Sequence, residues 1–261
     1  MAAHSLVIPI VQAVLCFAVV ILLRLCIVYL GPRIGGILIG TPMLIFPLLA
    51  MQALLGPMPD QAQTIGSLAS ITSVTLGLWS MRLPFNFNAL TAVLTMGAAW
   101  LAILMSLYFF KVPAIVMAVA IVSNVVLVLT KYRSHAEPKS GRASLLEGAI
   151  PTAIFLLVFF LTTQVVPDFV RGVLAMFPVA LLATLYFVRS TSNLEQFRNF
   201  VTYAHAAVTS TAAFVIVVHF TIAHLPIALS LLVSLVVSIA VSVLIGSIWR
   251  RTPQFQTPAG V

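Results

Sequence analysis

Apolar residues in this chain form long runs separated by short polar breaks. Runs long enough to cross a bilayer as a helix, which takes about 20 mostly apolar residues, cover residues 5–30, 35–55, 62–80, 86–108, 112–131, 148–166, 172–189, 198–221 and 225–248. Residue pairs that break helices mark most of the boundaries: Gly31-Pro32, Gly56-Pro57, Leu83-Pro84, Val112-Pro113 and Leu225-Pro226. The pattern predicts an all-α polytopic membrane protein with about nine transmembrane helices.

Composition supports this prediction and excludes a soluble fold. The 261 residues are 62% hydrophobic and 7% charged, whereas a soluble domain is about 45–50% apolar and about 25% charged. So few charges could not cover a soluble surface without leaving large apolar patches exposed. The first run is too long for the apolar region of a signal peptide, so we interpret it as a transmembrane helix.

The basic residues indicate orientation rather than nucleic-acid binding. The net charge is +8, but the basic residues lie singly or in short groups between apolar runs, not on one clustered face. If the N-terminus is outside, the outer loops hold only Lys111 and Arg171. The inner loops and the C-terminus then hold Arg33, Arg82, Lys131, Arg133, Lys139, Arg142, Arg189, Arg198, Arg250 and Arg251. We therefore expect a bacterial-type inner membrane protein with its N-terminus outside and its C-terminus in the cytoplasm, in contact with membrane lipids and not with nucleic acid.

The two halves of the chain share an ordered set of helix breakers. Gly36 and Pro42 in the second run match Gly172 and Pro178 in the seventh, and each pair is 136 residues apart. In both halves an apolar run follows, then a polar loop with one carboxylate, a helix rich in Ser and Thr, and a Leu-Pro pair. Such an ordered match indicates an internal repeat.

The repeat predicts three parts of the chain. Residues 1–110 form a first four-helix repeat, 111–147 a connector helix and cytoplasmic linker, and 148–261 a second four-helix repeat with a short tail. An offset of five helices inverts the second repeat relative to the first. Inverted repeats are a recurrent architecture of secondary transporters, whose substrate site lies near the midplane where the repeats meet.

A family resemblance accompanies the repeat. The second half, from FVRGVLAMFPVALLATLYFV through HLPIALSLLVSLVVSIAVSVLI, resembles the small GlpM-type inner-membrane proteins. In these proteins one helix opens from Gly to Pro and the last opens with Leu-Pro. The segments GGILIGTP and RLP extend the resemblance to the first half. It implies an architecture of two fused units and supplies no catalytic residues.

Polar groups within the apolar runs are the candidate substrate-binding residues, because such groups are costly in hydrocarbon. His205 and Thr209 share a helix face, with Tyr203 and Ser210 nearby. This face is suited to bind a substrate or relay a proton; the alternative is a hydrogen bond between helices.

A second candidate is a polar stripe in the third run, formed by Ser70 and Ser73 with Ser67 one turn earlier. If the halves are equivalent, this stripe faces the Ser/Thr-rich helix of the second half across a polar cavity. The alternative is close packing between helices through small residues.

Three further residues have two interpretations each. Pro42 and Pro178 either break their helices and expose carbonyl groups to substrate or lie harmlessly near a helix start. Arg24 either extends to the cytoplasmic surface or contacts an anion inside the bundle. Asp168 is expected to cap the seventh helix.

Several kinds of site have no counterpart in the sequence. It contains no nucleotide-binding Gly-rich loop with Lys, no His-Glu-x-x-His and no carboxylate cluster. Cys16 and Cys26 are ten residues apart, so on a helix they point in different directions. We expect no metal, no cofactor and no catalytic group, and any proton coupling would depend on histidine.

The sequence therefore favours a secondary transporter or exporter of a small molecule. Two alternatives stay open: a noncatalytic subunit of a larger membrane complex, and a membrane-embedded enzyme acting on lipids. Assembly as a homodimer or within a membrane complex also stays open.

Overall fold

The structure is a computed structural model in which the described part of the chain is built from α-helices. It describes residues 10–11, 13–14, 17–18, 21, 42, 45–55, 59–81, 88–110, 113–129, 154, 157–158, 161–162, 165–176, 181–182, 185–186, 189–190 and 194–251. Among these, the helices with defined bounds are α3 (Ile45–Leu55), α4 (Gln61–Ser80), α5 (Ala89–Phe110), α6 (Pro113–Leu129), α8 (Asp168–Ala175), α10 (Leu194–Thr221) and α11 (Ile227–Arg251). The residues described contain no strand. Most of the runs 5–30 and 148–166 lies outside the described residues, so the count of nine spans stays a prediction.

Three helices are long and apolar enough to cross a membrane. The apolar spans are Ala89–Ser106 in α5, Phe200–Thr221 in α10 and Ile227–Ile245 in α11, and α6 carries a shorter apolar stretch, Ala114–Val126. These segments agree with four of the runs predicted from the sequence.

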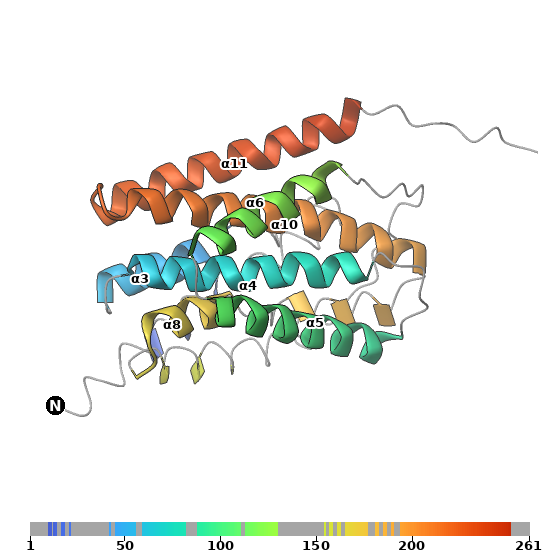
Figure 1. Ribbon diagram of the computed structural model, residues 1–261, viewed down its shortest axis with the longest axis horizontal. Coiled ribbons are helices and arrows are strands. Elements are labelled where there is room, and N and C mark those ends of the chain that lie inside the picture. Colours follow the sequence, from blue (N-terminus) through green and yellow to red (C-terminus); the bar gives the residue numbers. More distant parts are fainter. Residues whose placement is uncertain are drawn as a thin grey trace, which may run out of the picture.

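The helices lie side by side around α4 (Figure 1). Helix α4 packs against α5, α6, α8 and α10, while α11 packs along α10 and touches α3. Almost every residue of α4 from Gln63 to Leu78 is buried. The most central helix is thus one of the least hydrophobic, because polar side chains in a lipid environment are stabilised by partners inside the bundle.

The outer helices present their apolar side chains outward. Large exposed hydrophobic residues cluster on α5, α6 and α11: Leu90, Leu94, Leu101, Met105, Ile115, Ile121, Val122, Val125, Val126, Leu229, Leu232, Val236, Ile239, Val243 and Leu244. The buried polar residues lie mainly on α4, α10 and the inner face of α11, and include Ser70, Ser73, His205, Ser210, Ser230, Ser234 and Ser238. Apolar outside and polar inside is the arrangement expected for helices solvated by lipid.

The structure describes the surroundings of Pro42 and both ends of α8. Pro42 does not lie inside the described helix α3; it lies in a turn ahead of it, where its carbonyl oxygen accepts a 2.6 Å hydrogen bond from the Phe46 amide. Helix α8 begins at Asp168, earlier than predicted, and ends at Ala175 with Met176 in a turn. This end lies just before Pro178, and proline disfavours helical conformation in the preceding residue.

Candidate functional site

Helices α4 and α8, which come from different halves of the chain, cross in close backbone contact. A Cβ atom built on Gly66 would overlap the carbonyl oxygen of Phe169, and one built on Gly172 would overlap the carbonyl oxygen of Gln63. The hydroxyl of Ser67 donates a 3.1 Å hydrogen bond to the Gly172 carbonyl. Glycine is needed at both positions because the two backbones touch.

The serine stripe of α4 binds neighbouring helices of the protein. Ser70 donates to the Met176 carbonyl at 3.2 Å and accepts from the Trp100 indole N–H at 3.0 Å. Met176 follows the last residue of α8, so its carbonyl lies beyond the helix end and is open to a side-chain donor. Ser73 is also buried and donates to the Ala69 carbonyl within α4. Ser67 and Ser70 thus face α8 and α5, not the Ser/Thr-rich helix of the second half as the predicted geometry required.

The side of α4 that faces α10 carries two contacts between histidine and threonine. The imidazole Nδ1 of His219 lies 2.8 Å from the Thr64 hydroxyl, and Nε2 of His205 lies 3.0 Å from the Thr75 carbonyl oxygen. A carbonyl only accepts hydrogen bonds, so Nε2 of His205 carries a proton and donates. The partner numbers rise along α4 as they fall along α10, which makes the two helices antiparallel.

The Thr64 hydroxyl can form its hydrogen bond with His219 in two ways. It lies 2.8 Å from the Gln61 carbonyl as well as 2.8 Å from His219 Nδ1. When it donates to Gln61, its oxygen accepts a hydrogen bond from a protonated Nδ1; when it rotates, it donates a hydrogen bond to an unprotonated Nδ1. This contact therefore accommodates both protonation states of Nδ1 without losing the hydrogen bond to the histidine.

The predicted partner face of α10 is engaged as well. Thr209 donates a 2.9 Å hydrogen bond to the amide oxygen of Asn124 on α6, in addition to its bond to the His205 carbonyl. Ser210 donates to the Ala207 carbonyl, and its own carbonyl accepts from Ser238 of α11 at 2.8 Å. This face therefore joins α10 to α6 and α11 as well as to α4.

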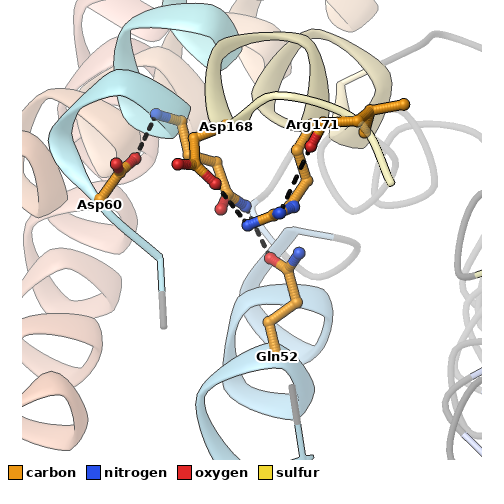
Figure 2. Close-up of polar contacts among 6 residues, drawn as sticks. Gln52, Asp60, Asp168 and Arg171 are labelled. Atoms are coloured by element: carbon orange, nitrogen blue, oxygen red, sulfur yellow. Dashed lines mark hydrogen bonds and ion pairs between the residues drawn. The ribbon is translucent and has the colours of Figure 1, made fainter. Parts of the chain in front are cut away.

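A second polar cluster lies at the end of the bundle where α3 ends and where α4 and α8 begin (Figure 2). The side-chain Nε2 of Gln63 donates a 2.6 Å hydrogen bond to Oε1 of Gln52, and both residues are fully buried. Arg171 is paired with Asp168 at 2.6 Å, and its side chain is 8% exposed against 45% for the aspartate. The cluster therefore places a buried cation and two buried amides beside a carboxylate that reaches the surface.

Both carboxylates at this end act locally on their helices. Asp60 caps α4, because its Oδ1 accepts a 2.7 Å hydrogen bond from the backbone N–H of Gln63. Asp168 does not cap α8 as expected: Pro167 is the N-cap residue, with no side-chain cap bond, and Asp168 occupies the first turn. A carboxylate in the first turn still opposes the positive end of the helix dipole.

The remaining predicted site residues fall outside what can be described. Arg24 and Pro178 lie outside the described residues, and only the backbone of Tyr203 is described, as part of α10. In the described part of the chain, no group of three or more His, Cys, Asp or Glu side chains is placed to hold a metal ion.

The structure also brings in residues that the sequence did not single out. Gln63, Thr64 and His219 are all in the contacts above. Their partners lie on other helices, and each contact depends on how one helix is rotated against another. Helical periodicity gives no information about that rotation.

Comparisons of the chain with protein-family models, with characterised proteins and with solved structures give no match. The resemblance to GlpM-type proteins therefore stays a prediction from the sequence.

Proposed function

We propose that this chain is an integral inner-membrane secondary transporter or exporter of a small molecule, whose substrate passes between the two halves of the chain. One observation carries the proposal: the junction between the halves is buried and polar. On α4 of the first half, Ser67, Ser70 and Thr75 bond to Gly172, Met176 and His205 of the second half. Polar groups at a helix junction in hydrocarbon are costly, and substrate pathways are one established reason for their presence.

The predicted inverted repeat is part of the proposal. Helices α4 and α10, which are equivalent in the repeat, run antiparallel (Figure 1). Opposite directions are what an inverted pair requires. The opposite directions support a repeat of two four-helix units with a site between them.

The histidines of α10 are the proposed coupling groups. His205 and His219 both contact α4, and histidine is the side chain whose ordinary titration range lies nearest neutral pH. A proton that enters or leaves either ring changes the charge held at the interface between α4 and α10. In a carrier with alternating access, such contacts must change as one bundle moves against the other.

Flux measurements test this function. The full chain would be reconstituted in liposomes and tested with a panel of labelled metabolites, with and without a proton gradient. We expect at least one solute to accumulate faster than in empty vesicles, and the rate to respond to the gradient. The absence of flux for the whole panel under both conditions would count against a transporter.

A matched pair of variants separates coupling from folding. His205→Gln keeps an N–H for the Thr75 carbonyl, so the helix contact persists while the titrating ring is removed. His224→Gln alters a histidine that is exposed in the turn between α10 and α11. We expect gradient-driven flux to be lost in the first variant and kept in the second.

A further inference from the structure

The amide pair of Gln52 and Gln63 is incomplete. Two facing amides can form two hydrogen bonds, but only Gln63 Nε2 to Gln52 Oε1 is made here. The other two atoms, Nε2 of Gln52 and Oε1 of Gln63, are buried and have no hydrogen-bond partner among the described residues. An unsatisfied buried polar atom carries a desolvation cost, so two of them beside each other indicate that something else binds there.

The surroundings of this pair are charged. The α4 turn that holds Gln63 lies against the α8 turn that holds Arg171, because the Gln63 carbonyl touches Gly172. Asp168 and the Val166 carbonyl hold the Arg171 guanidinium, at 2.6 Å and 3.4 Å. Figure 2 shows the Gln52 amide and the Arg171–Asp168 pair directed into the same region. The Asp168 side chain is partly exposed, so this ion pair lies near the surface of the protein.

We propose that Gln52, Gln63, Arg171 and Asp168 form a binding site for small α-amino or α-hydroxy acids. The carboxylate of such a ligand accepts from Gln52 Nε2, in the positive field of Arg171 and of the first turns of α4 and α8. The amino or hydroxyl group on the adjacent carbon donates to Gln63 Oε1, and an ammonium is also attracted by Asp168. The ligand thus supplies one acceptor and one donor on neighbouring atoms, as the two amides require.

Transport of this ligand rests on the proposed function, whereas its binding does not. A single water molecule could satisfy both amide atoms, but water would not distinguish between carboxylic acids. The proposal therefore predicts a selectivity that a structural water cannot produce. Loss of either the carboxylate or the adjacent donor should weaken binding.

Binding is measured on the full chain in lipid nanodiscs. The probes are labelled L-alanine and L-lactate, with propionate as the analogue that lacks the donor and L-alaninamide as the analogue that lacks the carboxylate. We expect saturable binding of alanine or lactate, and competition by either analogue weakened about tenfold or more, the effect of one lost hydrogen bond to a charged or buried group. Alanine and lactate together distinguish an ammonium donor from a hydroxyl donor.

The variant Gln52→Leu with Gln63→Leu removes both amides at once, and replacing both partners by apolar groups is well tolerated in a buried position. Gln61→Leu is the matched control, because Gln61 is exposed on the same helix. Binding should be lost in the double variant and kept in the control. The comparison of analogues on the unaltered chain decides the question even where the double variant does not fold.

The outcomes separate the site from the transport function. Binding of alanine or lactate without flux in liposomes would support the binding site and contradict the transport function. Flux of other solutes with no binding of either acid would keep the transporter and overturn the site. Equal binding of propionate or alaninamide, or unchanged binding in the double variant, would also overturn the site.

Discussion

Gly66 of α4 and Gly172 of α8 lie in the same helix crossing, and each faces a backbone carbonyl of the opposite helix. No side chain separates the two backbones at this point, which allows the Ser67 hydroxyl to reach the Gly172 carbonyl. Small residues at such crossings let membrane helices approach closely and gain packing energy. The contact fixes how α4 sits on α8.

We expect Gly66→Ala and Gly172→Ala to destabilise the protein by about 3 kcal/mol or more, because the added methyl group would overlap rigid backbone atoms. Thermal unfolding of the purified protein in detergent measures the change. Gly97→Ala on α5 is the control: a Cβ there meets nothing within 4 Å, so this variant should be neutral or gain up to about 1 kcal/mol in helix propensity. Similar melting temperatures for all three variants would show that the crossing is not close.

Ser70 tests whether the serine stripe holds the bundle together. Ser70→Ala removes the donor to the Met176 carbonyl and the acceptor for the Trp100 indole, with an expected loss of about 2 kcal/mol, at about 1 kcal/mol for each bond in a membrane protein. Ser106→Ala should change stability by less than about 0.5 kcal/mol, because this serine is exposed and bonds only to its own helix.

The same pair of variants separates packing from substrate binding. A Ser70→Ala protein of unchanged melting temperature that no longer transports would reverse our interpretation. Ser70 would then contact the solute, as the sequence hypothesis held.

The contact between His205 and Thr75 is expected to be structural as well as functional. His205→Ala leaves the Thr75 carbonyl without its donor and opens a small cavity, for an expected loss of about 2–4 kcal/mol. His205→Gln retains a donor and should recover most of this stability while gradient-driven flux stays absent, because an amide does not exchange protons near neutral pH. Recovery of both stability and flux by glutamine would argue against a role in coupling.

Orientation in the membrane is tested from both ends of α11. In a chain with Cys16 and Cys26 replaced by alanine, His224→Cys should react with a membrane-impermeant maleimide in intact spheroplasts, since this exposed turn is expected outside. A fluorescent protein fused after Val261 should fold and fluoresce in the cytoplasm. Active alkaline phosphatase at that same position would place the C-terminus outside and invert the topology.

The helix positions could be predicted from the sequence because membrane helices need long apolar runs with few charges. The predicted runs 62–80 and 225–248 agree within a few residues with α4 (Gln61–Ser80) and α11 (Ile227–Arg251). Polar residues within the predicted runs were also recognisable, since Ser70, His205 and Ser210 stand out in apolar surroundings and are buried in the structure. Lipid requires each helix to be apolar and makes each polar residue in it costly, so both features are visible in the sequence of a single helix.

Only the tertiary structure decided which polar groups meet. The serine stripe lies against α8 and Trp100, and the threonines on another side of α4 bind the histidines of α10. The rotation of α4 is set by backbone contact at Gly66 and Gly172, residues 106 positions apart. Helical periodicity defines the faces of one helix but carries no information on how far that helix is turned toward another. For the same physical reason, the pairing of Gln52 with Gln63 depends on how α3 and α4 pack and does not follow from the sequence.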